Sequence, residues 1–216
     1  MRMSKFEQFS GRKEAFAETE SPEARFNRIA EEAEAAGGAR FEQQTKDGLG
    51  DHWVEDAEKK RLYEIKFALK DPNNPEKGTS YYYDKRFKYN ERGHLVQEEG
   101  QDFSDDKKGN AWKADFERSD RGEVTNELGE IQAGPDKGHK WQKQFNKSVL
   151  EDGTDVFQED GEILEQGQNP KKEPKGHAWQ QVWETKEGST THGGRISGGP
   201  EQGRAWGSWE KLKSVS

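Results

Sequence analysis

Aromatic residues at a regular spacing are the side chains in this sequence whose types and positions best suit molecular recognition. A glycine followed three positions later by an aromatic residue recurs along the chain, with the aromatic at Trp53, Tyr81, Trp112, Trp141, Trp179 and Trp206. The intervals between these positions are 28, 31, 29, 38 and 27 residues. A period of this size indicates a repeated supersecondary unit. Exposed rings at such positions could stack against the C–H faces of a sugar or anchor a protein partner.

The repeat has the pattern of a β-hairpin. Within residues 109–131, Trp112, Ala114 and Phe116 alternate with charged residues, which places both aromatics on one face of a strand. Residues 119–122 have the composition of a turn, after which the alternation resumes. A second aromatic four residues after the first appears as Phe116, Phe145 and Trp183, and Tyr83 with Phe87 gives the same pair slightly out of register.

Side chains typical of catalytic or metal sites form no recognisable motif. The sequence contains no P-loop, nucleophile elbow, H-E-x-x-H motif or dinucleotide fingerprint, and it has no cysteine. His139 and His177 precede Trp141 and Trp179 by two residues, where they would either hydrogen-bond a ligand hydroxyl or pack within the repeat. Their wide separation argues against a metal site. We therefore expect a protein that is not an enzyme, with no catalytic residues, no metal and no cofactor.

The composition limits the size of the hydrophobic core and the classes of partner that the protein can bind. Only 28% of the 216 residues are hydrophobic and 36% are charged, with a mean hydropathy of −1.35. A net charge of −8 disfavours binding to nucleic acid or acidic membranes. No apolar run is long enough to cross a membrane, and the first twenty residues lack the apolar segment of a secretory signal. We expect the plastid stroma, as a mature form, or the cytoplasm.

The chain divides into three expected parts. Residues 1–20 form an N-terminal arm, residues 21–38 a helix capped by Ser21 and ended by two glycines, and residues 39–216 the repeat β-sheet domain. The helix is expected to lie against one end of the sheet and protect an edge strand. The glycine pairs near residues 193–199 are expected to be mobile, and the spacing of Trp206 and Trp209 indicates a bulge or a strand end.

The expected fold class is mainly β: an extended antiparallel meander sheet of hairpin repeats of about 30 residues, with one short N-terminal helix. The low hydrophobic content favours a thin sheet that is wet on both faces, and a small packed sandwich with long loops is the alternative. The aromatics would be core in a closed fold. The residue two positions after a tryptophan is polar in three repeats, as Lys143, Gln181 and Ser208. These residues should lie on the same face as the tryptophans, and this favours an aromatic face that is exposed to water.

Two stretches carry a resemblance to a known family, namely residues 176–188 (GHAWQQVWETKEG) and residues 203–211 (GRAWGSWEK). With their Gly-rich turns they resemble the tryptophan-rich region of the Early Starvation and Like Early Starvation proteins of plants and algae, over roughly residues 50 to 211. The resemblance implies a long antiparallel sheet with aligned aromatics, non-catalytic binding to amylopectin double helices and a part in organising starch.

The sequence thus predicts a binding face rather than a catalytic centre. The expected function is binding of ordered α-glucan through an aromatic ladder, and the alternative is a structural or scaffold protein that binds a large protein assembly or filament through the same face. The expected partner is a polysaccharide or a protein assembly, without nucleic acid or membrane insertion. The expected ligand-binding residues are Trp53, Tyr83, Trp112, Phe116, Trp141, Phe145, Trp179, Trp183, Trp206 and Trp209.

Overall fold

A computed structural model describes residues 20–44, 49–68, 80–104 and 107–215. The expected N-terminal arm lies outside these residues, except for Glu20, as do residues 45–48, 69–79, 105–106 and 216. The elements are α1 (Pro22–Ala35), β1 (Ala39–Gln44), β2 (Leu49–Glu55), β3 (Arg61–Ala68), β4 (Ser80–Tyr89), β5 (Leu95–Ser104), β6 (Lys107–Arg118), β7 (Val124–Ala133), β8 (His139–Val149), β9 (Asp155–Gln166), β10 (Ala178–Lys186), β11 (Ser189–Gly198), β12 (Ala205–Gly207), η2 (Trp209–Lys211) and η3 (Lys213–Val215).

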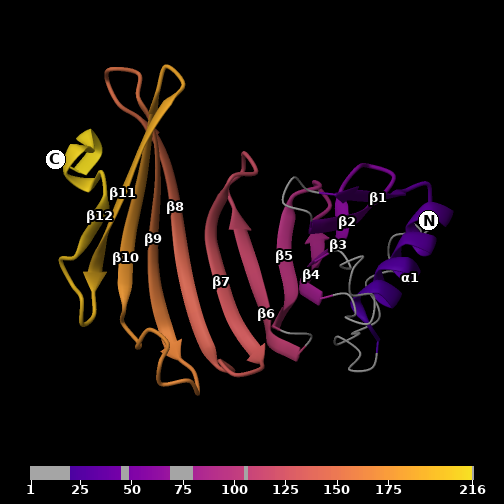
Figure 1. Ribbon diagram of the computed structural model, residues 1–216. Helices are drawn as coiled ribbons and strands as arrows, with labels where there is room; N and C mark the ends of the chain where they lie inside the picture. The colour runs from indigo at the N-terminus through magenta and orange to yellow at the C-terminus, as the bar shows by residue number, and fades with distance from the viewer. Residues whose placement is uncertain (1–19, 45–48, 69–79, 105–106, 216) are drawn as a thin grey trace.

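The strands form one twelve-stranded antiparallel sheet in which the spatial order equals the chain order, from β1 to β12 (Figure 1). The predicted fold class is therefore confirmed, and the alternative of two packed sheets does not apply to the strands described. Tight turns close the hairpins, and glycines in the left-handed region occur in them, such as Gly93 and Gly122 with φ of 76° and 83°. Figure 1 shows that the sheet is twisted and curved along its length, as strand chirality requires.

The register assigns every strand residue to one of two faces. One face carries Trp112 and Phe116 on β6, and we call it the tryptophan face. The other face carries Tyr63 and Ile65 on β3, and we call it the helix face because α1 packs there. Tyr63 and Ile65 are buried in one cluster with residues of α1, and Phe67, two residues further along β3, packs against it.

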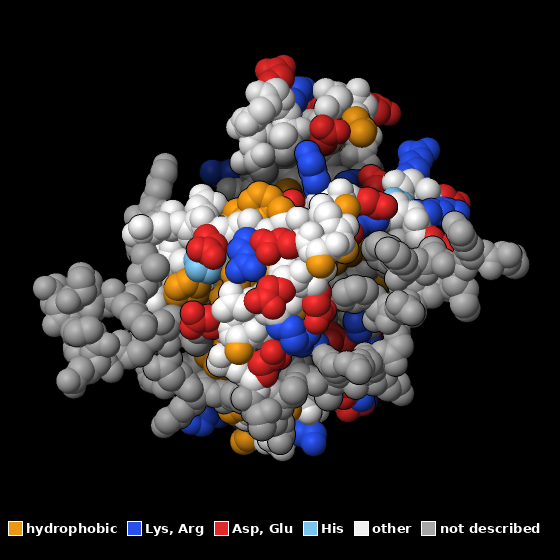
Figure 2. Space-filling view, turned by 90° about the vertical axis from the view of Figure 1, so that its right-hand side faces the viewer, with side chains coloured by type: hydrophobic (Ala, Val, Ile, Leu, Met, Phe, Trp, Pro, Cys, Tyr) orange, Lys and Arg blue, Asp and Glu red, His pale blue; other side chains and the backbone are white. Residues whose placement is uncertain are grey.

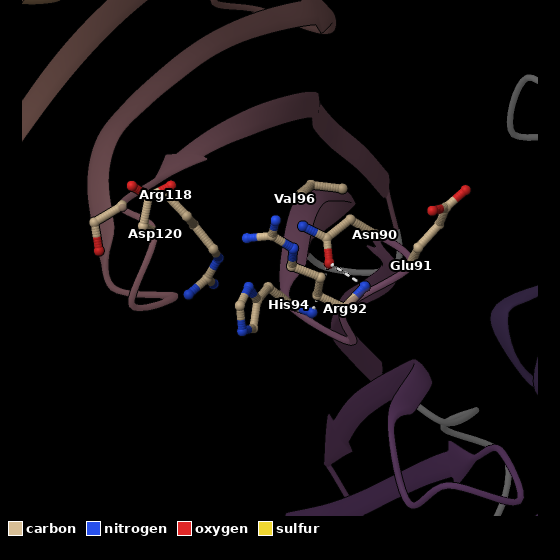
Figure 3. A pocket seen from close by; sticks show the side chains of 8 residues that line it. Asn90, Glu91, Arg92, His94, Val96, Arg118 and Asp120 are labelled. Atoms are coloured by element: carbon tan, nitrogen blue, oxygen red, sulfur yellow. Dashed lines mark hydrogen bonds between the residues drawn. The ribbon is translucent and has the colours of Figure 1, made fainter.

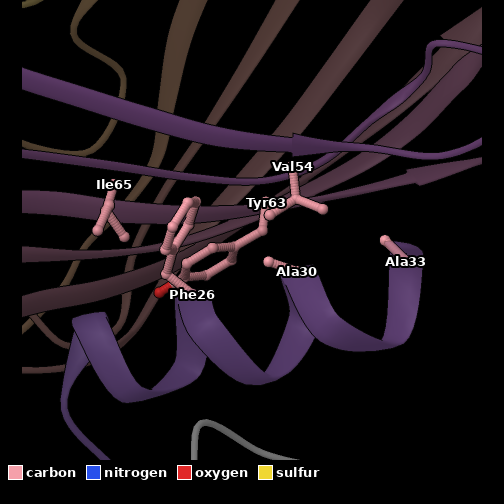
Figure 4. Packing of buried hydrophobic residues seen from close by; sticks show 6 residues of the cluster. All are labelled: Phe26, Ala30, Ala33, Val54, Tyr63 and Ile65. Atoms are coloured by element: carbon pink, nitrogen blue, oxygen red, sulfur yellow. The ribbon is translucent and has the colours of Figure 1, made fainter. Parts of the chain in front are cut away.

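The main hydrophobic core lies between α1 and the helix face of β2 and β3 (Figure 4). Ser21 caps the helix by accepting a hydrogen bond from the Ala24 N–H at 3.2 Å. Phe26, Ala30 and Ala33 then point toward the sheet, where they meet the buried side chains Val54, Tyr63 and Ile65. The helix lies against one end of the sheet, as expected. It covers a face of β1, β2 and β3 rather than an edge strand, because its apolar stripe matches the apolar positions of that face.

A buried polar group extends this core. Arg25 on α1 forms an ion pair with Asp84 on β4, and the Tyr63 hydroxyl donates to the same carboxylate at 2.8 Å. Burial raises the pKa of Asp84, and the positive charge of Arg25 acts in the opposite direction. Burial also raises the pKa of the Tyr63 hydroxyl. The helix is thus fixed to the sheet by polar contacts as well as by apolar packing.

The other end of the helix face has a smaller core. The C-terminal turns η2 and η3 place Leu212 against Val156 and Val182. Between the two cores the helix face is polar, with contacts such as Lys113 to Asp115 at 2.9 Å. At the end of the molecule seen in Figure 2, acidic and basic side chains are interspersed among small hydrophobic areas. The sheet is therefore wet over much of its surface, as its composition indicated.

Candidate aromatic binding face

Nine of the ten predicted ligand-binding residues lie on the tryptophan face by register. These are Trp53 on β2, Tyr83 on β4, Trp112 and Phe116 on β6, Trp141 and Phe145 on β8, Trp179 and Trp183 on β10, and Trp206 on β12. All nine are half-buried. They are therefore neither a closed core nor freely exposed rings.

Trp209 does not lie with the other nine. The strand ends at Gly207, as the three-residue spacing of Trp206 and Trp209 indicated, and Trp209 begins η2. Its side chain packs at the edge of the small core on the helix face, where the Arg195 guanidinium lies 5.1 Å from its ring centre. The prediction that Trp209 belongs to the aromatic ladder is wrong because the chain turns over the sheet edge after β12.

Four indole rings lie over glycines of the preceding strand. The register pairs Gly100 with Trp112, Gly129 with Trp141, Gly161 with Trp179 and Gly194 with Trp206. A Cβ atom built on Gly129 would stand only 1.9 Å from Cε2 of Trp141, and one on Gly161 would stand 2.1 Å from Cε2 of Trp179. Each ring thus covers the space where a side chain would rise from the sheet. In all four pairs the ring atoms nearest to the glycine are Cε2 and Cζ2 of the indole.

Carboxylates accept hydrogen bonds from three of these four indoles. The indole N–H of Trp141 donates to Glu127 at 2.7 Å, and that of Trp179 donates to Glu159 at 2.9 Å. Both glutamates stand two residues before the glycine that the ring covers. Trp112 makes the corresponding hydrogen bond to Asp102 on β5. Partial burial raises the pKa of Asp102, and the bond from Trp112 acts against this rise.

A second aromatic row runs beside the indoles toward the other end of the strands. Phe145 stacks with Phe157 at 5.9 Å between ring centres, and Phe157 contacts Trp183 at 5.4 Å. His192 stacks on Trp183 at 4.6 Å. Polar residues separate the two rows, and among them Gln181 donates to Glu159 at 3.1 Å. The face therefore alternates flat apolar rings with amide and carboxylate groups.

The aromatics at the N-terminal end already have protein partners. Phe41 stacks on Trp53 at 5.1 Å, and the Arg61 guanidinium lies 4.7 Å from the Trp53 ring centre. The Tyr83 hydroxyl donates to Glu64 at 2.7 Å. Burial and this hydrogen bond raise the pKa of Tyr83. Among the four indoles over glycines, Trp112 also has a cationic partner, because the Lys85 Nζ lies 5.5 Å from its ring centre.

The two histidines that precede Trp141 and Trp179 contact other residues of the protein. His139 is 7% exposed, and its Nδ1 lies 3.0 Å from the carbonyl oxygen of Gln166. Each ring lies 6.3 Å from the indole two residues later, Trp141 for His139 and Trp179 for His177. For His139 these contacts favour packing within the repeat over contact with a ligand.

Sequence reasoning missed the glycines under the rings. Gly193 and Gly194 were expected to be mobile, yet both are buried in β11. A Cβ on Gly194 would collide with the Trp206 ring, and one on Gly193 would stand 2.4 Å from the Trp209 backbone nitrogen. The recurrence of Glu-x-Gly at 127–129 and 159–161 was the available signal for these positions.

A polar hollow of about 390 Å³ lies where β7 and β8 separate. Their pairing ends at Asn126 and Gln144, although β8 continues to Val149. The lining residues are Glu117, Thr125, Asn126, Gln144, Phe145, Asn146 and Asp160. By register, Glu117, Asn126, Gln144, Asn146 and Asp160 belong to the helix face, so the hollow lies mainly on the side opposite the aromatic rows.

Other kinds of site are not found in the described part of the chain. It contains no group of three or more His, Asp or Glu side chains placed to hold a metal ion. Of the helices described there, none has the length and apolar character needed to span a membrane. Comparison of the chain with protein-family models, with curated proteins and with solved structures found no match.

Proposed function

We propose that the tryptophan face binds an ordered α-glucan, such as the double helices of starch, without catalysing a reaction. The observation that carries this proposal is the seating of Trp112, Trp141, Trp179 and Trp206 on glycines. A half-buried ring that covers a glycine keeps part of its surface exposed as a flat apolar area, which suits the C–H face of a sugar ring. The choice of α-glucan among saccharides follows from the resemblance to starch-binding tryptophan-rich proteins.

The spacing of the rings suits a repeating ligand. The indoles stand on every second strand, so successive rings are about 10 Å apart along the sheet, twice the usual distance between strands. The carboxylates of Glu127 and Glu159 lie beside the rings and can accept hydrogen bonds from sugar hydroxyls in addition to those from the indoles. A polymer would then gain a similar increment of binding energy at each ring, and starch would place the protein in the plastid stroma.

The test is a set of single substitutions measured by sedimentation with starch granules. Trp112→Ala, Trp141→Ala and Trp179→Ala should each weaken binding by about 1 kcal/mol, or roughly fivefold. Because the three rings stand on separate hairpins, their effects should add in the multiple variants. Leu128→Ala, which removes an exposed side chain from the helix face, is the matched control and should leave binding unchanged.

Stability measured on the same variants distinguishes binding from folding. If the rings were core, each change would cost about 3 to 5 kcal/mol of unfolding free energy. Loss of binding that merely follows unfolding would count against the glucan proposal. Added salt should have little effect, because a neutral sugar releases no counterions.

A second candidate function is binding to a large protein assembly, and the free edge of β1 favours it. Within the described sheet, β1 pairs only with β2, and Phe41 on β1 is 38% exposed. Such an edge can add a strand from another protein. This candidate predicts one or two dominant anchor residues and a clear dependence on salt, in contrast to the stepwise loss expected for a glucan.

A further inference from the structure

A second hollow, of about 370 Å³, lies between two hairpin turns at one end of the sheet. One turn joins β4 to β5 (residues 90–94), and the other joins β6 to β7 (residues 119–123). The turns are equivalent: the N–H of Asn90 donates to the carbonyl of His94, and the N–H of Ser119 donates to that of Glu123, each at 2.9 Å. Each turn also carries an arginine just before its glycine, Arg92 in the first.

Three basic side chains line this hollow. Figure 3 shows Arg92, His94 and Arg118 directed toward the same space from the two turns. Arg118 is held by the backbone, because its Nε donates to the carbonyl of Leu95 at 2.5 Å and its Nη1 to that of Gly122 at 2.7 Å. These two bonds leave further guanidinium N–H groups for a ligand.

The other two basic groups are also positioned by the turns. The His94 ring lies against Gly122, where an added Cβ would stand 2.5 Å from Nε2. The Asn90 side-chain oxygen accepts from the backbone N–H groups of Arg92 and His94, both at 3.0 Å, which fixes the turn that carries them. The site is therefore built from local hydrogen bonds and does not depend on a flexible segment.

The basic groups that line this hollow are not paired with its acidic residues. Glu91 and Asp120 also line it, yet within the part of the chain described here neither forms an ion pair with Arg92, His94 or Arg118. Figure 3 shows Glu91 pointing away from the three basic groups. In a protein of net charge −8, basic groups that converge without a carboxylate partner favour an anionic ligand.

We propose that this hollow binds a phosphate group, either as free phosphate or as the phosphate monoester of a sugar. Two guanidinium groups and an imidazole can donate to a tetrahedral oxyanion from three directions, and the arginine fork matches the spacing of phosphate oxygens. The site lies at the ends of the β4–β5 and β6–β7 hairpins. It does not depend on the function proposed for the tryptophan face.

The test compares two equivalent arginines by isothermal titration calorimetry with inorganic phosphate, glucose 6-phosphate and acetate at one fixed ionic strength. Arg92→Ala should weaken binding of both phosphates roughly tenfold or more, as expected for loss of a charge-assisted hydrogen bond. Arg121→Ala is the matched control, because Arg121 occupies the same turn position but does not line the hollow. Acetate should bind more weakly than phosphate. Tighter binding of glucose 6-phosphate than of inorganic phosphate would identify a phosphorylated sugar as the source.

Two results would overturn the proposal. The first is that the unmodified protein binds neither phosphate. The second is that Arg92→Ala and Arg121→Ala weaken binding equally, which would assign the effect to net charge alone. Amide chemical shifts recorded with phosphate should change in residues 90–95 and 118–122, and changes elsewhere without changes there would also count against the site. Urea unfolding of both variants checks that the fold is retained.

Discussion

Substitution of the glycine beneath an indole tests the structure of the aromatic face most directly. In Gly129→Ala, the new Cβ would stand 1.9 Å from Cε2 of Trp141. Carbon atoms in contact are normally about 3.5 Å apart, so the ring must move by about 1.6 Å. Gly129 lies in an ordinary strand conformation, and the backbone itself therefore accepts alanine.

The expected energy follows from what the ring loses when it moves. The hydrogen bond from Trp141 to Glu127 is charge-assisted, and such bonds contribute about 1.5 to 3 kcal/mol. Alanine in place of glycine within a strand stabilises the folded state by about 0.5 to 1 kcal/mol. We therefore expect Gly129→Ala to destabilise the protein by about 1 to 2 kcal/mol in urea unfolding and to weaken granule binding as much as Trp141→Ala does.

A double-mutant cycle isolates the contribution of the ring. In a Trp141→Ala background, Gly129→Ala should be neutral or slightly stabilising, because no ring is left to displace. Gly109→Ala is the matched strand control, since the atoms nearest to its Cβ belong to no ring: they are the backbone oxygen, Cβ and carbonyl carbon of Asp102, at 3.2, 3.4 and 3.5 Å. If Gly129→Ala were equally costly with and without the indole, the seating of the ring on glycine would not be the cause.

Three further predictions concern stability and shape. Hydrogen bonds from Asn169 and Asn110 and the charge of Lys172 lower the pKa of Asp136, so its contribution to stability is present above the ordinary Asp pKa of about 3.9 and is lost as the pH falls through the lowered value. The loss of unfolding free energy as the pH falls should therefore be less steep in the Asp136→Asn variant than in the unmodified protein. Asp84→Ala, which leaves the Arg25 charge buried, should cost about 3 to 5 kcal/mol by urea unfolding, and a cost below 1 kcal/mol would contradict the burial of this pair. Small-angle scattering should give a radius of gyration above the value of about 17 Å for a compact globule of this length, and a value near 17 Å would contradict an open sheet.

Local patterns in the sequence predicted the elements of this fold well. The two-residue alternation around Trp112 placed its strand and its face correctly, and Ser21 with Pro22 placed the start of the helix. These features depend on neighbouring residues, so they can be recognised in a single stretch of chain. The meander order also follows from short hairpin turns, which bring consecutive strands together.

Features that depend on pairing between strands could not be predicted in the same way. Gly129 lies 12 residues before Trp141, but Gly161 lies 18 residues before Trp179, because the intervening loops differ in length. Gly100 and Gly194 also lie 12 residues before Trp112 and Trp206, so this spacing identifies three of the four glycines, and only the longer loop before Trp179 breaks it. The contact between Arg25 and Asp84 joins residues 59 positions apart, and the sequence gives no local sign of it.

The short pairing between β7 and β8 has a mechanical consequence. These strands share five residue pairs, whereas β8 and β9 share eleven. Beyond Gln144, an exposed ion pair between Lys147 and Glu123, at 3.3 Å, bridges the separation. Fewer backbone hydrogen bonds cross the boundary between β7 and β8 than the boundary between β8 and β9. We therefore expect the sheet to deform more easily between β7 and β8. Apart from the boundary of the short edge strand β12, which shares three residue pairs with β11, this boundary has the fewest paired residues in the described sheet, and we expect the twist to change most easily there.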